Sequence, residues 1–311
     1  MTVREFIEDC RKRLLPLYDE KEAASLASRA LEDIFNISRT KQLTYPNYPI
    51  GPNCVPDLSI TPEQVIDRLC SGEPVQYIAG FEYFCGSKFR VGPGVLIPRP
   101  ETEELVNLIL SDLDGLKERH GINPYKIFDV CTGSGCIAWT LQDRLSKQTE
   151  VETYGCDISE EAVRYARHQG IGTNNLMPHT SRFPMFLKYD VLNGDLNMLK
   201  SFIGKLDVIV SNPPYIAEKE KEQMHRNVLD FEPAEALFVP DDNPLVFYER
   251  IAGMAKELLR PGGLLYFEIN PLFAEGLKTL LEEEGFKSIH FSKDLAGRQR
   301  FLTVKQNLPN Q

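Results

Sequence analysis

The stretch KIFDVCTGSGCIAWTLQDRL, residues 126–145, decides the fold. Its first five residues are typical of a buried strand, and the segment from Gly135 onward is typical of a helix. Gly133 and Gly135 let the connecting loop turn tightly and let a ligand approach the backbone closely. Free N–H groups at the start of the helix can meet an acidic or polar group. In an open parallel sheet, the first strand-to-helix turn of this kind is a place where nucleotide-like ligands bind.

The rest of the C-terminal part alternates between strand and helix patterns. We expect strands at 151–157, 183–190, 206–211 and 264–269, and helices at 159–170, 243–263 and 273–285. Asn243 is the expected N-cap of the second of these helices, and Gly262 and Gly263 its end. Segments 286–292 and 298–304 are expected to close the sheet as an antiparallel pair. Such alternation predicts an α/β fold with a mostly parallel sheet that helices cover on both faces.

The N-terminal part has a different pattern, which predicts a small helical domain over residues 1–75. A capping box, Thr2 with Glu5, opens the first helix, and Thr61 with Pro62 opens a later one. Residues 76–100 mix aromatic, β-branched and glycine residues, and we interpret them as a linker of one or two β-hairpins. Residues 101–311 then form the larger domain.

Composition excludes several classes of protein. The net charge of −10 does not favour a protein whose main task is to grip nucleic acid, so we expect no direct nucleic-acid partner. Seven cysteines at irregular spacing, with no CxxC, are typical of reduced thiols, and neither they nor the five histidines have metal-ligand spacing. We therefore expect no metal. There is no signal-peptide pattern and no apolar segment long enough for a membrane span, so we predict a cytoplasmic protein without a membrane partner.

Three aspartates follow predicted strands near the glycine loop. Asp157 ends the second strand, where an acid accepts hydrogen bonds from ribose hydroxyls of either NAD or S-adenosylmethionine. Asp129 ends the first strand, where a carboxylate could orient the ammonium group of S-adenosylmethionine. Asp190 ends the third strand and could accept from an adenine amino group, or serve only as a turn or capping residue. Together they favour S-adenosylmethionine, although the glycine loop alone also fits NAD or a tight turn without a ligand.

The fourth strand runs into Asn212-Pro213-Pro214-Tyr215. Two prolines end a strand, because neither has an N–H to donate to the ladder. The Asn212 side-chain oxygen and the Pro213 carbonyl are two acceptors that can hold a planar NH₂ group, while Tyr215 offers a flat face for stacking. A nitrogen held in this way can point at a methyl group in line with its leaving group. The turn therefore predicts methylation of a planar NH₂ group.

Several segments resemble the HemK/PrmC family, the peptide chain release factor glutamine N5-methyltransferases of the class I S-adenosylmethionine-dependent type. The similar segments are EPVQYIAGFEYF, FRVGPGVLIPRPETEELV, DVCTGSGCIA, SNPPYI, FEPAEALF followed by FYERI, and DLAGRQRF, spanning about residues 73–304. The resemblance implies a Rossmann-like sheet of seven strands preceded by a substrate-binding helical domain. It also implies transfer of a methyl group to the glutamine of the Gly-Gly-Gln loop of class I release factors, in translation termination.

The resemblance also implies residue roles. Those implied for the cofactor, S-adenosyl-L-methionine, and its product S-adenosyl-L-homocysteine are Thr132, Gly133, Ser134, Gly135, Asp157, Asp190, Val191 and Asn212, beside Asp129. Asn212, Pro213, Pro214 and Tyr215 would hold the glutamine, with Asn212, Pro213 and Tyr215 as the catalytic set, and Arg99 and Glu101 would help shape the site. Two positions depart from the family: Cys131 replaces a more usual glycine, and EINPLF, residues 268–273, receives no role.

Other functions stay open at the level of sequence. An adenine or guanine N-methyltransferase would use the same Asn-Pro-Pro-Tyr turn, but it would need to grip phosphates. An NAD-dependent dehydrogenase would leave that turn without a task. A non-catalytic binding module would have no need of an intact turn.

Overall fold

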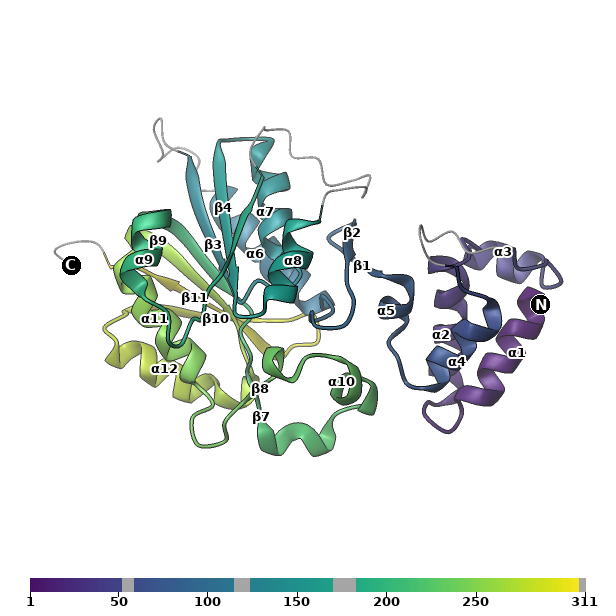
Figure 1. Ribbon diagram of the computed structural model, residues 1–311. Helices are drawn as coiled ribbons and strands as arrows, with labels where there is room; N and C mark the ends of the chain where they lie inside the picture. Colours follow the sequence, from purple (N-terminus) through teal and green to yellow (C-terminus); the bar gives the residue numbers. More distant parts are fainter. Residues whose placement is uncertain (52–58, 115–123, 170–182, 308–311) are drawn as a thin grey trace. The chain divides into compact units, whose positions relative to one another are not determined.

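The computed structural model describes residues 1–51, 59–114, 124–169 and 183–307 (Figure 1). The chain forms two compact units. The helical unit comprises Met1–Phe81, Val91–Pro93 and Met224–Glu232, and the sheet unit comprises Glu82–Arg90, Gly94–Gln223 and Pro233–Gln311. Each unit is described by itself.

The predicted capping box and the predicted N-cap Thr61 are both present in the helical unit, and Thr61 also forms a capping box with Gln64. Thr2 and Glu5 cap α1, and Thr61 and Gln64 cap α4, whose first residue is Pro62. Buried side chains follow one face of α1 at spacings of three and four, and they pack on small residues of α2, which allows the two helices to approach closely. The helices are α1 (Val3–Leu14), α2 (Glu20–Asp33), α3 (Arg39–Thr44), α4 (Pro62–Cys70) and α5 (Val75–Ala79).

The segment 76–100 contains one hairpin, made of β1 (Phe81–Phe84) and β2 (Ser87–Arg90). Cys85 and Gly86 both have positive φ, at 49° and 79°, as a tight two-residue hairpin turn requires. Helix α5 precedes it and was not predicted, because five residues are too few to establish a helical period. Its aliphatic residues are buried in the core of the helical unit.

In the described part of the chain, seven strands form the sheet that the sequence predicted. Their order is β10-β11-β9-β6-β3-β4-β5. Strands β9, β6, β3, β4 and β5 run parallel to one another, whereas β11 lies antiparallel to β9 and β10. The strands are β3 (Tyr125–Val130), β4 (Val151–Asp157), β5 (Met185–Lys188), β6 (Leu206–Ser211), β9 (Leu259–Glu268), β10 (Ser288–Lys293) and β11 (Gln299–Lys305).

Helices cover both faces of this sheet, and successive strand residues serve the two layers in turn (Figure 1). Ile127 packs under α6, α7 and α8, whereas the next residue, Phe128, packs under α9, α11 and α12. The helices are α6 (Pro100–Asp114), α7 (Cys136–Ser146), α8 (Glu160–Arg167), α9 (Leu196–Ile203), α11 (Val246–Leu258) and α12 (Ala274–Glu283). Shorter elements are β7 (Ile216–Ala217), β8 (Phe238–Val239), α10 (Arg226–Phe231) and the 3₁₀ turns Glu218–Gln223, Ala234–Ala236 and Pro271–Phe273.

The predicted bounds of the helix at 243–263 are wrong at both ends. Asn243 lies in a turn that precedes α11, where its N–H donates to the Pro240 carbonyl, and Leu245 is the N-cap. At the other end, Pro261, Gly262 and Gly263 belong to strand β9. A register shift against β6 occurs here, and Gly262 has a φ of 81°, so the glycines serve an irregular strand rather than a helix end.

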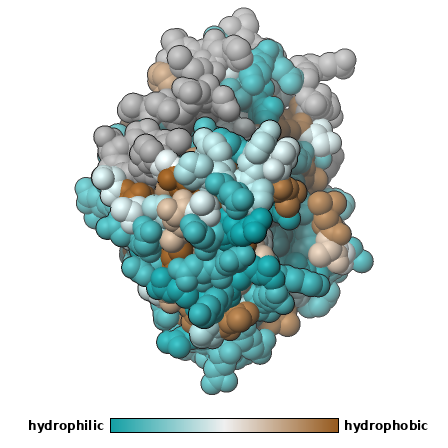
Figure 2. Space-filling model, turned by 90° about the vertical axis from the view of Figure 1, so that its right-hand side faces the viewer, coloured by the Kyte–Doolittle hydropathy of each residue, from teal (hydrophilic) through white to brown (hydrophobic). Residues whose placement is uncertain are grey.

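Surface and cysteine features agree with the composition. The face in Figure 2 is mostly hydrophilic, with hydrophobic residues in small separate groups. Within the described ranges, no helix is both long and apolar enough to cross a bilayer. The six described cysteines are free thiols, and Cys54 lies outside the described residues.

Candidate active site

An open cavity, with about 920 Å³ of empty space when the solvent at its mouth is included, lies where β3, β4, β5 and β6 end, at the carboxyl edge of the parallel strands. Parallel strands bring their C-terminal loops to one edge, which is why residues far apart in the sequence meet here. The predicted site residues that line the cavity are Arg99, Thr132, Gly133, Ser134, Asp157, Asp190, Val191, Asn212 and Pro214. The remaining predicted site residues, Glu101, Asp129, Gly135, Pro213 and Tyr215, do not line it.

The glycine loop has the left-handed backbone that its sequence predicts. Gly133 and Gly135 have φ of 54° and 79°, and open space lies where a Cβ on Gly133 would point. A Cβ on Gly135 would lie 3.0 Å from the Ala166 Cβ and the Phe186 ring, so this glycine allows α7 to pack closely. Cys131 also has a positive φ, of 60°. This backbone conformation favours glycine, which explains why a glycine is more usual there.

Asp129 lies under this loop, fully buried. Its Oδ2 accepts hydrogen bonds from the Thr132 hydroxyl at 2.5 Å and from the Ala138 N–H at 3.2 Å. Its Oδ1 is buried and has no hydrogen-bond partner among the described residues. Burial raises the pKa of this carboxyl to about 7, against the two hydrogen bonds, which lower it. The site therefore contains one buried acceptor without a donor.

The raised pKa of Asp129 gives a prediction for the ligand-free protein. The folded carboxyl holds its proton more tightly than the unfolded one, whose pKa is about 3.9, so its contribution to stability is complete below pH 4 and is lost as pH rises through 7. Asp129→Asn has no such proton. We expect the unfolding free energy of the variant, relative to that of wild type, to rise by up to about 1.4 kcal/mol per pH unit between pH 4 and 7. Urea unfolding at several pH values measures both free energies. A difference between variant and wild type that does not change with pH would contradict the prediction.

Asp157 connects the glycine loop to the end of β4. Its Oδ2 accepts from the Gly133 N–H at 2.9 Å, and its Oδ1 accepts from the Ser159 N–H at 3.0 Å, in the turn that opens α8. Burial raises the pKa of this carboxyl, and the backbone donors oppose the rise. Each carboxylate oxygen has further acceptor capacity. Asp157 can therefore accept hydrogen bonds from two neighbouring hydroxyls while it holds the loop.

Asp190 lines the cavity, and its side chain also stabilises a turn, which was the alternative role considered for it. Its Oδ1 accepts from the Leu192 and Asn193 N–H groups, and its Oδ2 accepts from the Asn193 side-chain amide. These hydrogen bonds hold the pKa of the carboxyl below its usual value. The turn presents Val191 to the same cavity.

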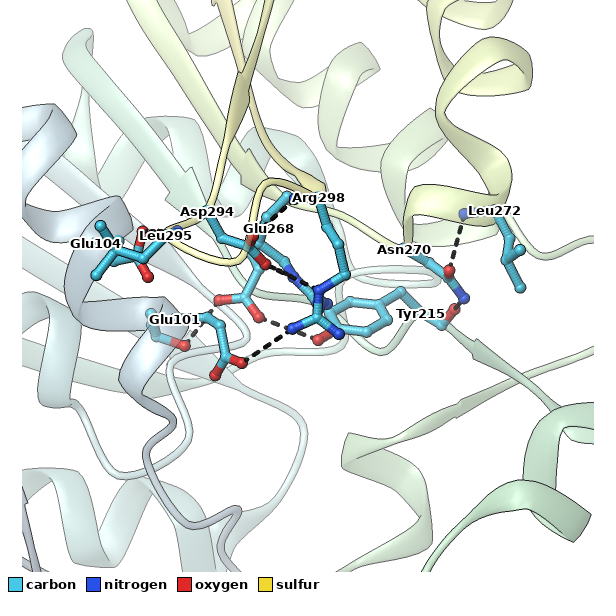
Figure 3. A network of polar contacts seen from close by, with 11 residues as sticks. Glu101, Glu104, Tyr215, Glu268, Asn270, Leu272, Asp294, Leu295 and Arg298 are labelled. Carbon is cyan, nitrogen blue, oxygen red and sulfur yellow. Dashed lines mark hydrogen bonds and ion pairs between the residues drawn. The ribbon is translucent and has the colours of Figure 1, made fainter.

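Asn212 is half-buried at the cavity wall, directly after β6. Its side-chain NH₂ donates to the Thr102 hydroxyl at 3.2 Å, and that hydroxyl donates to the Glu268 carboxylate at 2.7 Å. Tyr215 donates its hydroxyl to the other oxygen of Glu268 at 3.0 Å (Figure 3). Burial and the neighbouring Glu268 raise the pKa of the Tyr215 phenol, so it stays protonated at neutral pH.

The EINPLF segment, residues 268–273, contacts the Asn-Pro-Pro-Tyr turn through two of its residues. Glu268 is buried with 1% of its surface exposed, and burial raises the pKa of its carboxyl. Asn270 donates from its side chain to the Tyr215 carbonyl at 3.2 Å and accepts from the Leu272 N–H at 3.0 Å (Figure 3). Sequence reasoning missed Thr102, Glu268 and Asn270. The available signal was one acid in the otherwise apolar strand LLYFEI.

Glu101 lies beside the site rather than in it. Its carboxylate is 3.7 Å from the Arg298 guanidinium, which also pairs with Asp294 at 3.3 Å (Figure 3). Arg99, two residues earlier, lines the cavity. The substrate-binding role of both residues stays a prediction.

Two family models match the chain. The Methyltransferase small domain matches residues 107–237, and the PrmC N-terminal domain matches residues 5–80. A release factor glutamine methyltransferase of Bacteroides thetaiotaomicron is 44% identical over 244 residues, which cover 78% of this chain and 80% of that protein. One of Flavobacterium psychrophilum is 34% identical and covers 98% of this chain and 99% of that protein.

The chain belongs to the release factor glutamine methyltransferase family. The prediction of a methyltransferase is therefore confirmed, and so is the class I methyltransferase fold. The solved catalytic domain of hMettl16, in complex with MAT2A 3′UTR hairpin 6, shares this fold with a TM-score of 0.52 and 17% identity, covering 73% of this chain and 77% of that chain. In this chain, the residues that match the PrmC N-terminal domain form a helical region that precedes the sheet in the sequence.

Proposed function

We propose that this chain transfers a methyl group from S-adenosylmethionine to the side-chain amide nitrogen of the glutamine in the Gly-Gly-Gln loop of class I release factors. The observation that carries the proposal is the position of Asn212. It lines the same cavity as the glycine loop and Asp157, so an acceptor for a planar NH₂ group and a nucleoside-type site share one space. Membership of the family supports the choice of a protein glutamine over another NH₂ group.

The donor set fits S-adenosylmethionine, which supplies a methyl group on a sulfonium when bound. Asp157, Asp190 and Val191 line one cavity. Asp157 would accept hydrogen bonds from the ribose hydroxyls, and the turn at Asp190 and Val191 would hold the adenine. Thr132, Gly133, Ser134 and Gly135 hold the methionine part. The buried, partnerless Oδ1 of Asp129 supports a role for this carboxylate toward the ammonium group, because a nearby cation favours its ionised form.

The acceptor side is formed by the residues after β6. The Oδ1 of Asn212 and the carbonyl of Pro213 each accept one N–H of the glutamine amide, which fixes the nitrogen. Pro214 lines the cavity and holds the turn stiff. Tyr215, which follows it and does not line the cavity, would offer a flat surface once the amide lies against the turn. Holding the nitrogen in line with the methyl group removes much of the entropic barrier to transfer. No strong base is required, since the proton can leave after transfer.

The helical unit binds the release factor in this proposal. Its support is the match of residues 5–80 to the PrmC N-terminal domain. Two large apolar side chains at α3 are also exposed, Leu43 by 78% and Tyr45 by 60%. Exposed apolar residues of this size are found at protein-binding surfaces.

We expect the double change Leu43→Asp with Tyr45→Asp to raise the KM for release factor by about tenfold, because two exposed apolar contacts are lost. The cofactor affinity should not change. Steady-state methylation kinetics and calorimetric titration of the cofactor give the two values. Met198→Asp, which changes an apolar side chain exposed by 56% on α9 of the sheet unit, is the matched control. An unchanged KM in the double variant would argue against this surface.

The setting that we propose is the cytoplasm, without a membrane or nucleic-acid partner. The net charge of −10 supports the absence of a nucleic-acid partner, since proteins that hold nucleic acid neutralise phosphates with basic side chains.

Mass spectrometry tests the proposed function directly. Purified release factor is incubated with this protein and S-adenosylmethionine, and peptides covering the Gly-Gly-Gln loop are analysed. We expect one added methyl group, located on the glutamine. Parallel reactions contain transfer RNA, ribosomal RNA or DNA instead. Methyl transfer only to nucleic acid would overturn the proposal in favour of an adenine or guanine methyltransferase.

A further inference from the structure

A chain of hydrogen bonds joins three distant parts of the sequence at the acceptor side of the cavity. It runs from the Asn212 amide to the Thr102 hydroxyl and on to the Glu268 carboxylate, at 3.2 Å and 2.7 Å. Thr102 lies in the first turn of α6, and Glu268 is the last residue of β9. Figure 3 shows the Glu268 carboxylate also receiving the Tyr215 hydroxyl, so that its two oxygens have separate donors.

The direction of these bonds follows from counting hydrogens. A hydroxyl has one hydrogen to donate, and Thr102 gives it to Glu268, which in its ionised form can only accept. Toward Asn212, Thr102 therefore presents only lone pairs. The NH₂ group of Asn212 must face Thr102, and the amide oxygen Oδ1 must face the opposite way.

The reversed orientation of the Asn212 amide would be unfavourable at both ends. Its Oδ1 would face the lone pairs of Thr102, and its NH₂ group would face a substrate group that also carries only N–H donors. An amide oxygen or NH₂ left without a partner in a buried setting disfavours that orientation by one to two orders of magnitude in population.

We propose that Thr102 and Glu268 are positioning residues that fix the orientation of the Asn212 amide, so that its oxygen is presented to the methyl-accepting NH₂ group. This inference rests on the proposed function, because it concerns how Asn212 receives the acceptor. It assigns a task to Glu268 in the EINPLF segment and to Thr102 in the PRPETE segment, and neither residue reacts.

Thr102→Val tests the inference, because valine has the shape of threonine without the hydroxyl. We expect kcat for release factor methylation to fall at least about twofold, the factor for two equally populated orientations of Asn212. The fall should reach up to about 30-fold, because no acceptor then holds the Asn212 NH₂ group in the transition state. The affinity for S-adenosylmethionine and the KM for release factor should stay within about twofold of wild type, because the change acts on a transition-state contact. Thr102→Ser restores the hydroxyl and should return kcat to near the wild-type value.

Glu268→Gln tests the other end of the chain. Its amide has one oxygen and one NH₂ group, so one of the two hydroxyl neighbours can no longer donate to it. We expect Glu268→Gln to lower kcat. The double variant Thr102→Val with Glu268→Gln should lose less than the product of the two single losses, because both changes act through the same orientation of Asn212. Tyr248→Phe is the matched control: it removes a hydroxyl that donates to the Glu268 main-chain carbonyl at 3.1 Å, and it should leave kcat unchanged.

The outcomes separate this inference from the proposed function. If wild-type protein transfers no methyl group to release factor, the proposed function fails. If wild type is active but Thr102→Val keeps its kcat, or Thr102→Ser is as slow as Thr102→Val, or the two losses multiply, the positioning inference is overturned while the function stands. Thermal unfolding of each variant verifies that the compared proteins are folded.

Discussion

Replacing Asn212 by alanine is expected to abolish methyl transfer while cofactor binding is largely kept. The change removes the side-chain oxygen that accepts an N–H of the substrate amide, and the Asn212 contact with Thr102 is lost with it. Loss of one preorganised hydrogen-bond group at a reacting centre lowers kcat by roughly 10²- to 10³-fold. Single-turnover methylation of release factor measures the rate, and calorimetry measures the cofactor affinity, which rests mainly on Asp157 and the glycine loop.

Asn197→Ala is the matched control, since Asn197 is exposed on α9 and lies outside the cavity lining. It should have wild-type activity. Unchanged transfer by Asn212→Ala would contradict the role of the Asn-Pro-Pro-Tyr turn. An equal loss of cofactor affinity would mean that Asn212 belongs chiefly to the cofactor site.

The second large effect is expected for Asp157→Asn, which should weaken cofactor binding about 100-fold. Hydrogen bonds to a charged acceptor contribute about 1.5–3 kcal/mol each, and the amide can accept on only one of its two branches. Its NH₂ group would also face either the Gly133 N–H or the Ser159 N–H, which now donate to the carboxylate. Binding of S-adenosylhomocysteine, followed by calorimetry, avoids any dependence on turnover.

Asp195→Asn serves as the control for this variant. Asp195 is exposed and caps α9 through the Asn197 N–H, so the same chemical change is made outside the cavity. Its cofactor affinity should equal that of wild type. If Asp157→Asn also binds S-adenosylhomocysteine normally, the ribose contact must be assigned to another residue.

Most of the sheet unit could be predicted because its elements carry strong local signals. The segments at 151–157 and 206–211 became β4 and β6 with the predicted bounds, and most of their residues are buried, as is usual for parallel strands covered on both faces. The glycine loop and the two prolines were equally clear, because glycine permits backbone conformations that other residues avoid, whereas proline fixes φ and removes an N–H donor. These glycines and prolines also indicated the edge of the sheet where the cavity lies.

Contacts between distant segments could not be predicted. Thr102, Asn212 and Glu268 are joined only in the folded sheet unit, and no local pattern links α6 to the end of β9. The helix at 243–263 was predicted wrongly for a related reason: the pairing of β9 with β6 draws Leu259 and the residues after it into the sheet, although Pro261, Gly262 and Gly263 are typical of a helix end. Tertiary pairing overrides such local preferences.

The hydrogen bond from the Gly133 N–H to Asp157 is made entirely between groups of the protein. It ties the loop to the acid, so a nucleoside that binds there loses less conformational entropy than one that must order a mobile loop. The same loop and acid face the nucleoside after the methyl group has gone, because the ribose and adenine are identical in S-adenosylmethionine and S-adenosylhomocysteine. Spent cofactor should therefore compete with fresh cofactor, and sustained turnover should depend on the ratio of the two in the cell.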